Sequence, residues 1–366
     1  MNEDSFFLSH RKQIGIEAQR NGYEVTVVAK DTGSRAAIKR MGLKFIELPV
    51  NPTGMNPFQE FRTFLFLKKL YKNNPGIIVH HIGLKAMLYG SLAARNSGLA
   101  GVVNAVCGLG ILFSNEKSWL AKSIMEILKY ACNGNAVFIF QNHDDEKLFK
   151  DNKITGQGRT YYIKGSGIDL EEFSFKPMPQ EDNSKKKVLF TGRMVEDKGV
   201  VTLIQAAELL RNKYSGSVEF LLVGALSKNP KGINKAYLES VSDGVYIKWL
   251  GFRRDVRELL ESSSIVAFPS YYREGLPKSL IEANAVGRPI VTTDSIGCRD
   301  AVEDGVNGFL VPVKDSVQLA EKISILLDDY SLRCRMSKAA RAIAERDFSL
   351  KEVVRQHIET YDGFRH

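Results

Sequence analysis

No apolar run in the sequence approaches the roughly 20 residues that a membrane-spanning helix needs. The N-terminus also lacks the basic-then-apolar pattern of a secretory signal peptide. Cysteine is scarce: the 366 residues contain only Cys107, Cys132, Cys298 and Cys334, with no Cys-x-x-Cys pair. This pattern argues against a zinc site and against a disulfide framework. We therefore expect a cytoplasmic protein with reduced thiols.

Two glycine-rich phosphate-binding fingerprints are absent as well. The stretches GLGILF from Gly108 and GSGIDL from Gly165 both lack the third glycine of Gly-x-Gly-x-x-Gly, and no Gly-x-x-x-x-Gly-Lys-[Ser/Thr] occurs. These absences disfavour a nicotinamide-dependent dehydrogenase and a P-loop enzyme. No Asp-x-Asp motif is present either, so nothing in the sequence calls for a divalent metal. We expect neither a metal nor a cofactor.

Basic residues exceed acidic ones by nine, and most of the excess lies in the first 173 residues, with 22 Lys and Arg against 16 Asp and Glu. A basic excess suits nucleic acid, an anionic membrane or phosphorylated ligands, and it does not choose among them. No zinc-finger spacing or RNP-like aromatic run supports nucleic acid. We expect no nucleic-acid partner.

Short β-rich runs alternate with helical periods along most of the chain, which predicts parallel strands joined by crossover helices. The polar segment 169–184 separates the runs into two series, and we predict that it is a linker. The runs are EVTVVAK from Glu24, KFIEL from Lys44, IIVHH from Ile77, GVVNAV from Gly101 and AVFIF from Ala136, then KKKVLFTG from Lys185, VEFLLVG from Val218, VYIKWLG from Val245, SIVAFPS from Ser264 and RPIVTTD from Arg288.

We therefore predict two doubly wound, Rossmann-like domains that face each other across a cleft. The first covers residues 1–168 and the second 185–346. Helices are expected over 317–328, 331–346 and 349–361. The last helix, within residues 347–366, can pack on either domain.

The stretch VLFTGRMVEDKG, Val188 to Gly199, runs from a buried strand through a glycine loop to a helix start. Gly192 allows a ligand close to the backbone, and the side chains of Arg193 and Lys198 can hold a diphosphate. A solvated loop with charges at a helix start is an equally good interpretation of this stretch alone.

The stretch FPSYYREGLPKSLIEA, from Phe268, places Pro277 at a first helical position, so that free backbone N–H groups after Gly275 and Leu276 form an anion site. Glu274 precedes the helix, and Glu282 lies about two turns into it. Carboxylates are suited to accept hydrogen bonds from vicinal sugar hydroxyls.

These motifs resemble those of glycosyltransferase family 4 of the GT-B fold, whose donor-site signature Glu-x7-Glu corresponds here to Glu274 and Glu282. The resemblance spans essentially the whole chain. Within the family, the first blocks resemble the subgroup of N-acetylgalactosaminyl- and related transferases of bacterial surface glycan assembly. The blocks are NEDSFFLSHR, HHIGLKAMLYGSLAAR, VNAVCGLG, GRMVEDKG, YYREGLPKSLIEA and GCRDAVEDGVNGFLVP.

The resemblance implies a retaining, metal-independent transfer of a sugar from a nucleotide-sugar, expected to be a UDP-sugar, to a polyprenyl-diphosphate-linked or other glycan acceptor. Arg193 and Lys198 then hold the diphosphate, Glu282 the ribose hydroxyls and Glu274 the transferred sugar, beside the Gly275 and Leu276 amides. Cationic groups that meet the growing charge on the departing diphosphate lower the barrier.

The acceptor is expected on the first domain. His80, His81 and Lys85 are placed just beyond a strand on the cleft side, where an imidazole can take a proton or orient a sugar. Of two adjacent histidines, at most one is expected to face the cleft, and a structural role is the more frequent one.

Two further acceptor-side candidates come from the resemblance. His10 follows the position of the family's first strand. Where many relatives carry a histidine, this chain has Cys107, which shifts the expected contact to the backbone of Gly108 and Gly110.

The segment 56–74, NPFQEFRTFLFLKKLYKNN, has aromatic and aliphatic residues around much of its surface, together with Lys68, Lys69 and Lys72. It suits peripheral contact with an anionic membrane at its cytoplasmic face. A helix packed on the sheet with its lysines in water is the alternative.

Two other functions remain open from the sequence: a nucleotide-sugar epimerase of the same fold, and a non-catalytic module that binds a sugar-nucleotide or a membrane. The opening is also unusual, because a helix is expected over 9–21 with no strand before it. Relatives begin with an apolar strand that is central in such a sheet. We therefore expect about five to ten upstream residues to supply that strand.

Overall fold

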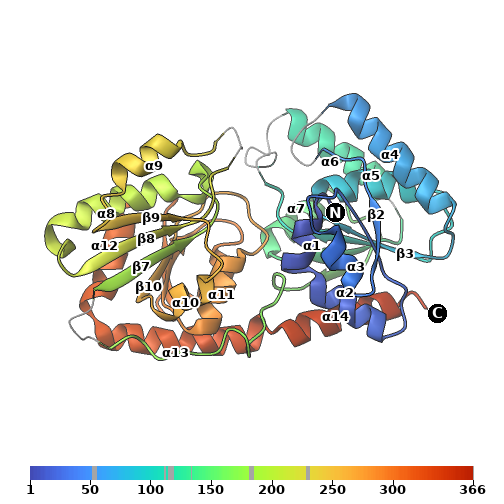
Figure 1. Ribbon diagram of the computed structural model, residues 1–366. Helices are drawn as coiled ribbons and strands as arrows, with labels where there is room; N and C mark the ends of the chain where they lie inside the picture. The colour runs from blue at the N-terminus through green and yellow to red at the C-terminus, as the bar shows by residue number, and fades with distance from the viewer. Residues whose placement is uncertain are drawn as a thin grey trace. The chain divides into compact units, whose positions relative to one another are not determined.

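The computed structural model describes residues 1–51, 56–110, 113, 119–132, 134–180, 185–227 and 231–365. The chain folds into two compact units. Unit 1 comprises Met1–Gly167 and Leu350–His366, and unit 2 comprises Ile168–Ser349. Both units are α/β with parallel sheets (Figure 1), which confirms the predicted fold class.

Unit 2 is built on one six-stranded parallel sheet in the order β12-β11-β10-β7-β8-β9. Its central strands are buried along nearly their whole length, as expected for strands covered by helices on both faces. Helices α8 and α12 pack together on one face, and α10 and α11 cover the other (Figure 1). The elements are β7 (Lys186–Thr191), η2 (Glu196–Lys198), α8 (Val200–Tyr214), β8 (Val218–Val223), α9 (Lys235–Val241), β9 (Ile247–Gly251), α10 (Val256–Glu261), β10 (Ile265–Phe268), α11 (Lys278–Val286), β11 (Ile290–Thr293), η3 (Arg299–Ala301), β12 (Gly308–Val311), α12 (Ser316–Asp328) and α13 (Tyr330–Asp347).

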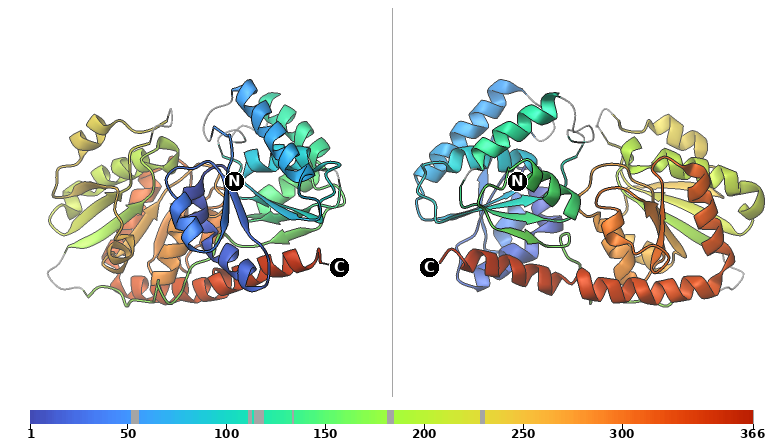
Figure 2. Two further views of the ribbon diagram at one scale, coloured as in Figure 1. Left: turned by 45° about the vertical axis from the view of Figure 1, so that its right-hand side comes forward. Right: turned by 180° about the vertical axis from the view of Figure 1, so that it is seen from behind.

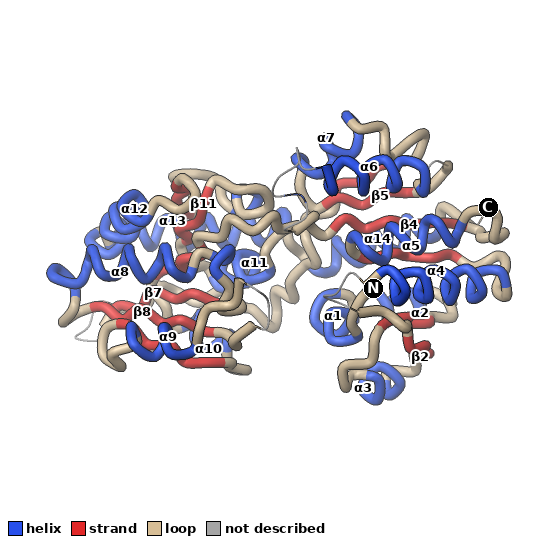
Figure 3. The backbone as a smooth tube through the Cα atoms, turned by 90° about the horizontal axis from the view of Figure 1, so that it is seen from above, coloured by secondary structure: helices blue, strands red, loops and turns tan. Residues whose placement is uncertain are grey.

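Unit 1 contains two separate parallel sheets, β1-β2 and β3-β4-β5-β6. Helices α4, α5 and α6 lie in a row on one side (Figures 1 and 3), and α14 packs beside α2 on the other (Figure 2). The elements are α1 (Asp4–His10), α2 (Lys12–Arg20), β1 (Thr26–Ala29), α3 (Arg35–Arg40), β2 (Lys44–Glu47), α4 (Pro57–Lys72), β3 (Ile78–Ile82), α5 (Leu84–Ala94), β4 (Gly101–Val106), α6 (Trp119–Ala131), β5 (Val137–Phe140), α7 (His143–Asp151), β6 (Thr160–Tyr162) and α14 (Leu350–Asp362).

The first helix differs from the prediction. Instead of one helix over 9–21, the chain forms α1 and α2, which meet at Arg11, where the backbone leaves helical geometry with φ −132° and ψ −3°. The Asp4 carboxylate fixes α1, because it accepts backbone hydrogen bonds from Thr32 and Ser34 at 3.0 and 2.8 Å. Residues before α1 are extended, and Glu3 forms an isolated parallel bridge with Lys30.

The segment predicted as a linker has two parts. Residues 181–184 lie outside the described residues, whereas 169–180 are held against unit 2 by arginine side chains. Arg288 donates to the carbonyl oxygens of Lys176 and Pro177 at 2.7 and 3.2 Å, and Arg341 donates to the carbonyl oxygen of Phe173 at 2.9 Å. This part is therefore a fixed edge of unit 2 and not a free connection.

Candidate active site

The strand order of unit 2 reverses beside β7, since β8 and β9 lie on one side of it and β10, β11 and β12 on the other. Such a switch point opens a crevice at the carboxyl ends of the strands, where ligands bind in doubly wound folds. The loops that leave the neighbouring strands β7 and β10 carry the two motifs found in the sequence, residues 192–199 and 269–277. The fold thus brings both motifs to one place.

The two loops are joined through their backbones. The Asp197 carbonyl oxygen accepts hydrogen bonds from the N–H groups of Tyr271 and Tyr272, both at 2.9 Å. Gly199, which follows η2, has φ +78° and lies so close to the Pro269 carbonyl group that a side chain at this position would collide with it. A glycine is therefore required for the loops to meet.

Lys198 and Glu274 form an ion pair across these loops. Both side chains are largely buried, 13% and 14% exposed, and the Lys198 ammonium also lies over the rings of Phe268 and Tyr272, at 5.3 and 5.4 Å from their centres. The rings and the carboxylate together hold the ammonium in a fixed position. Arg193, in contrast, is exposed in the same loop.

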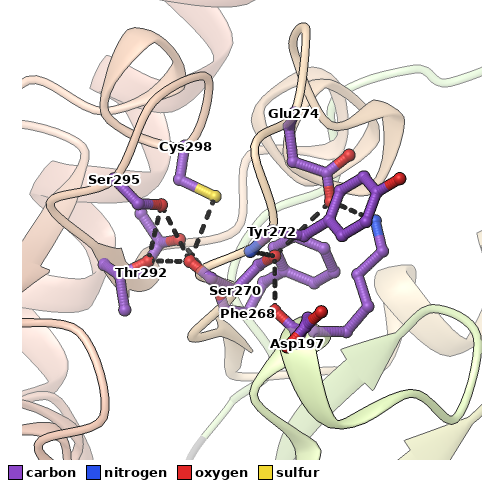
Figure 4. A network of polar contacts seen from close by, with 10 residues as sticks. Asp197, Phe268, Ser270, Tyr272, Glu274, Thr292, Ser295 and Cys298 are labelled. Carbon is purple, nitrogen blue, oxygen red and sulfur yellow. Dashed lines mark hydrogen bonds and ion pairs between the residues drawn. The ribbon is translucent and has the colours of Figure 1, made fainter. Parts of the chain in front are cut away.

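Ser270 holds the Glu274 loop in place (Figure 4). Its hydroxyl lies 3.2 Å from the Asp197 carbonyl oxygen and 3.4 Å from Glu274 Oε1, so that its single proton can be donated to either. Its carbonyl oxygen accepts from the hydroxyls of Thr293 and Ser295 and contacts Cys298 Sγ at 3.8 Å. Burial raises the pKa of the Cys298 thiol to about 11.

The Gly275-Leu276-Pro277 approach to α11 is buried. Pro277 is the N-cap residue with φ −63° and ψ 123°, one position earlier than predicted, and α11 begins at Lys278. A Cβ on Gly297 would lie 2.5 Å from the Gly275 carbonyl oxygen. The loop after β11 therefore packs tightly against Gly275 and fixes the helix start.

Glu282 lies on α11 with its side chain 15% exposed, and its Oε1 atom is 3.6 Å from the Lys278 ammonium. Burial raises the pKa of this carboxyl above its ordinary value, although Lys278 opposes the shift. A buried carboxylate with a raised pKa costs folding free energy and is a frequent feature of functional sites. Glu274 and Glu282 thus occupy different environments at the same helix.

The two adjacent histidines of unit 1 do not lie just beyond a strand, because β3 extends over Ile78–Ile82 and includes both. His81 is buried and bridges Tyr71 and Asn104, whose oxygens lie 3.0 and 2.8 Å from its ring nitrogens. Burial lowers the pKa of His81 to about 4. His81 is therefore a neutral core residue.

His80 is half-buried. Its Nδ1 atom lies 2.8 Å from the Tyr361 hydroxyl on α14, and its Nε2 atom is buried without a hydrogen-bond partner among the described residues. Burial, followed by the charges of His357 and Arg11, holds the pKa of His80 well below its ordinary value. His81 lacks the solvent access expected for a proton-transfer group, whereas His80 is half-buried.

The other acceptor-side candidates are distributed over unit 1. His10 ends α1 and stacks on Phe6 with ring centres 4.2 Å apart. Lys85 lies in the first turn of α5 and pairs with Glu60 of α4 at 2.7 Å. Gly108 and Gly110 lie in the loop after β4, and both have positive φ angles, 90° and 62°.

Several contributors to the site were not found from the sequence. Asp197 is 4% exposed, and its carboxylate is held by Lys231, whose Nζ lies 2.9 Å from both oxygens. Ser270 is fully buried. Both act through contacts between segments that are distant in the sequence, for which a lone aspartate or serine gives no sequence signal.

Within the described residues, no group of three or more His, Cys, Asp or Glu side chains could hold a metal ion. In the same part of the chain, no helix combines the length and the apolar character needed to cross a membrane.

Comparison with known proteins supports the family resemblance that the motifs indicate. The family described as "Glycosyl transferases group 1" matches residues 185–329, and "Glycosyl transferase 4-like" matches residues 1–142. The chain is 30% identical, over 93% of its length and 91% of the relative, to the N,N'-diacetylbacillosaminyl-diphospho-undecaprenol alpha-1,3-N-acetylgalactosaminyltransferase of Campylobacter jejuni. It is 23% identical, over 87% and 84%, to the UDP-Gal:alpha-D-GlcNAc-diphosphoundecaprenol alpha-1,3-galactosyltransferase of Escherichia coli.

Solved structures show the same fold. Anabaena HepE in complex with UDP superposes with a TM-score of 0.75 at 20% identity, covering 96% of this chain and 95% of HepE. Sucrose-phosphate synthase of Thermosynechococcus elongatus gives a TM-score of 0.78 at 20% identity, covering 96% and 92%. The resemblance to glycosyltransferase family 4 is thus confirmed, and the chain belongs to this family of GT-B glycosyltransferases.

Proposed function

We propose that the enzyme transfers galactose or N-acetylgalactosamine from the UDP-sugar to an undecaprenyl-diphosphate-linked glycan, with an α-1,3 linkage. The observation that carries the proposal is the buried Lys198–Glu274 pair at the switch point of unit 2. The names of the two relatives supply the substrates: both are α-1,3 transferases that act on sugars linked to diphospho-undecaprenol. A surface polysaccharide or glycoconjugate is the expected product.

In the proposed donor complex, Arg193 and Lys198 bind the two phosphates of UDP. The exposed Arg193 can turn toward an incoming diphosphate, whereas Lys198 is already held by Glu274 and two aromatic rings. Glu282 accepts hydrogen bonds from the ribose hydroxyls, and Glu274 accepts them from the transferred sugar, beside the Gly275 and Leu276 amides.

The reaction breaks the bond between the anomeric carbon and the diphosphate and forms a bond from that carbon to an acceptor oxygen on the same face of the sugar. The acceptor proton moves to the departing phosphate oxygen. Negative charge therefore grows on the diphosphate in the transition state, where Lys198 and Arg193 stabilise it more than in the ground state. We propose that this chemistry needs no bound metal, which undiminished turnover in excess EDTA would support.

The decisive experiment offers the purified protein a panel of UDP-, GDP- and ADP-sugars together with an undecaprenyl-diphosphate-linked acetamido sugar, and reads the products by mass spectrometry. We expect one added hexose or N-acetylhexosamine from a UDP-sugar only. A parallel reaction without acceptor separates transfer from epimerisation, since an epimerase converts the donor sugar there. Conversion without acceptor, and no product with it, would contradict the proposal.

We also propose that unit 1 contacts the cytoplasmic face of the membrane through α4 and α6. Helix α4 buries Thr63, Leu67 and Tyr71 and exposes Phe58 and Phe61, at 88% and 60%. Lysines 68, 69 and 72 follow on the same helix, and α6 exposes Trp119 and Tyr130, at 78% and 62%. Aromatic residues beside lysines suit the headgroup region of an anionic bilayer, where a lipid-linked acceptor resides.

Co-sedimentation with vesicles tests this contact. We expect binding to vesicles with anionic phosphatidylglycerol, weaker binding at rising salt, and at least a threefold loss for Phe58→Ser combined with Phe61→Ser. Phe252→Ser is the matched control, because Phe252 is 69% exposed on unit 2. Equal binding to neutral vesicles, or an equal loss in the control, would disprove it.

A further inference from the structure

The loop between β7 and η2 is held along one side by the loop that follows β8. The Met194 N–H donates to the Ala225 carbonyl oxygen, and the Met194 carbonyl oxygen accepts from the Ile233 N–H, both at 3.0 Å. The Glu196 N–H donates to the Lys231 carbonyl oxygen at 3.0 Å. Backbone bonds of this kind fix two segments side by side, as in a short β-ladder. The chain that leads to η2 therefore follows a fixed path.

Asp197, in η2, connects this arrangement to a third loop. Its carbonyl oxygen accepts from the N–H groups of Tyr271 and Tyr272, both at 2.9 Å, in the loop after β10. Its carboxylate binds Lys231 in the loop after β8, with Nζ at 2.9 Å from each carboxylate oxygen. Strands β10, β7 and β8 are neighbours in the sheet. One residue thus joins the loops that leave three adjacent strands at the switch point.

The two members of this ion pair differ in burial. The side chain of Asp197 is 6% exposed, whereas that of Lys231 is 47% exposed. A buried carboxylate is costly without a cationic partner, but a half-exposed ammonium can be hydrated by water instead. Asp197 therefore depends on Lys231 more than Lys231 depends on Asp197. Such a pair adds little net stability compared with apolar side chains, but it can hold the segments that it joins in one arrangement.

Lys198 follows Asp197 directly at the end of η2, so the position of its ammonium depends on where Asp197 is held. Lys198 forms the ion pair with Glu274. Ser270 makes a second connection, since its hydroxyl contacts both the Asp197 carbonyl oxygen and Glu274 (Figure 4). A displacement of about 1 Å in a group that acts on the reacting atoms can lower a rate about 100-fold. Contacts that hold Asp197 therefore bear on the reaction.

We propose that Asp197 and Lys231 are positioning residues for the sugar transfer, and that they hold Lys198 where the departing diphosphate needs it. This inference rests on the proposed function, because that function assigns Lys198 to the diphosphate. Lys231 also balances the buried Asp197 carboxylate, which would otherwise repel a diphosphate bound beside Lys198. Both residues act through Lys198 and through the loop that carries Glu274.

Three variants of the full chain test the proposal. Lys231→Met removes the ammonium, keeps a long unbranched side chain and leaves the Asp197 carboxylate without this partner. Lys231→Arg keeps a cation, and the double variant Lys231→Met, Asp197→Asn removes both charges. Lys248→Met is the matched control, because Lys248 pairs with Glu219 at 2.8 Å and both side chains are largely buried, 26% and 17% exposed. That pair joins β8 and β9 near their amino ends, away from the crevice.

Steady-state transfer assays measure the effect on the reaction. We expect Lys231→Met to lower kcat at least about fivefold and to leave the KM for the UDP-sugar within about twofold, because Lys198 acts mainly in the transition state. Lys231→Arg should keep at least about half of the wild-type kcat, and the double variant should recover part of the loss. Lys248→Met should match wild type. An unchanged kcat in Lys231→Met, or an equal loss in Lys248→Met, would overturn the proposal.

Amide hydrogen exchange in the free enzyme tests the same loops without any substrate. We expect the Tyr271 and Tyr272 N–H groups to exchange at least about threefold faster in Lys231→Met, because their acceptor on Asp197 is held less firmly. Residues 265–268 in β10 serve as the internal reference. Unchanged exchange of the two tyrosines would overturn the proposal whatever the rates. A wild-type enzyme that transferred no sugar would instead contradict the proposed function, and the exchange result would still decide whether the pair holds the loops.

Discussion

The interiors of the two units are organised differently. In unit 2 the buried apolar residues form one continuous core on both faces of a single sheet. In unit 1 they form four separate clusters around two sheets and a cavity. The proposed catalytic groups stand on the continuous core, which can hold side chains at fixed positions, whereas unit 1 depends on buried polar contacts between its parts.

The difference extends to titratable groups. All six histidines belong to residues 1–167 or 350–366, and burial lowers the pKa of three of them, His80, His81 and His357. Unit 2 instead buries Arg288 and Arg333, whose guanidinium groups donate to backbone carbonyl oxygens. Acidification therefore acts selectively on unit 1.

The largest expected effect is a loss of unit 1 stability between pH 6.5 and 5. Burial lowers the pKa of His81 to about 4 and that of His357 to about 3, and His80 shifts in the same direction. Below pH 6.5 the unfolded chain takes up protons that the folded chain does not, so stability falls as pH falls. The slope is at most about 1.4 kcal/mol per pH unit for each histidine, or about 4 kcal/mol per pH unit for three.

The two tryptophans allow this difference to be measured, because Trp119 belongs to unit 1 and Trp249 to unit 2. Urea unfolding of Trp119→Phe and Trp249→Phe variants, followed by fluorescence at pH 7.5 and 5.5, reports each unit separately. His143→Asn is the control, since His143 is exposed. An equal shift of the Trp249 transition would contradict the selective effect.

The second prediction concerns unit 2 and its ion pair. Lys198→Ala or Glu274→Ala is expected to lower turnover at least tenfold, about 1.4 kcal/mol or more in activation free energy. Each change leaves the other charge in a largely buried place without its partner. Steady-state transfer assays with UDP-sugar and lipid-linked acceptor measure the loss.

Lys235→Ala is the matched control, because Lys235 pairs with Glu239 on the exposed surface of the same unit. If the pair acts as one element, the double variant Lys198→Ala, Glu274→Ala loses less than the product of the single losses. Wild-type rates in both single variants would refute the site assignment.

Much of unit 2 could be predicted from its sequence. Its strands are continuous apolar runs because both faces of the sheet are covered, and that pattern is local. The helices predicted over 317–328 and 331–346 agree with α12 and α13 within one residue. The motifs that contain Lys198 and Glu274 are also predictable, because each follows an apolar strand in the sequence.

Other features leave no local pattern. The break at Arg11 depends on how α1 and α2 pack on the sheet, and a helix through Arg11 satisfies the same periodicity. The environment of His81 depends on Tyr71 and Asn104, from a helix and a neighbouring strand. Likewise, arginines 288 and 341 bind the 169–180 segment through backbone carbonyls, which carry no sequence information. Contacts of these kinds appear only when distant segments are placed together.

A matched pair of tyrosines gives the third prediction. The Tyr361 hydroxyl bonds to His80 in unit 1 at 2.8 Å, and the Tyr246 hydroxyl donates to the Ala207 carbonyl oxygen in unit 2 at 2.9 Å. Changing either to Phe leaves a buried partner unsatisfied and costs about 1 kcal/mol or slightly more. Each loss of stability should appear in the unfolding transition reported by the tryptophan of the same unit. If the Tyr361→Phe variant changed only the transition reported by Trp249, the assignment of Tyr361 to the stability of unit 1 would be contradicted.

The smallest effect is expected at Glu282, where function and stability should change in opposite directions. Burial raises the pKa of the Glu282 carboxyl in the folded state. The protonated carboxyl therefore contributes to stability, and this contribution is lost as the pH rises through the raised pKa. At neutral pH the ionised carboxylate lowers the free energy of unfolding. Glu282→Gln removes this charge at similar volume, and we expect a rise in the unfolding midpoint of unit 2 of about 1–3 °C at pH 7.5.

The same change should weaken donor binding. Both oxygens of a carboxylate can accept hydrogen bonds from the ribose hydroxyls, whereas in an amide only the oxygen can accept and the nitrogen cannot. Calorimetry with UDP and differential scanning of the free enzyme measure the two effects. The Glu345→Gln variant serves as control, since Glu345 is an exposed ion-pair residue on α13. A variant that binds UDP as tightly as wild type while being more stable would show that Glu282 is buried for reasons other than the ribose.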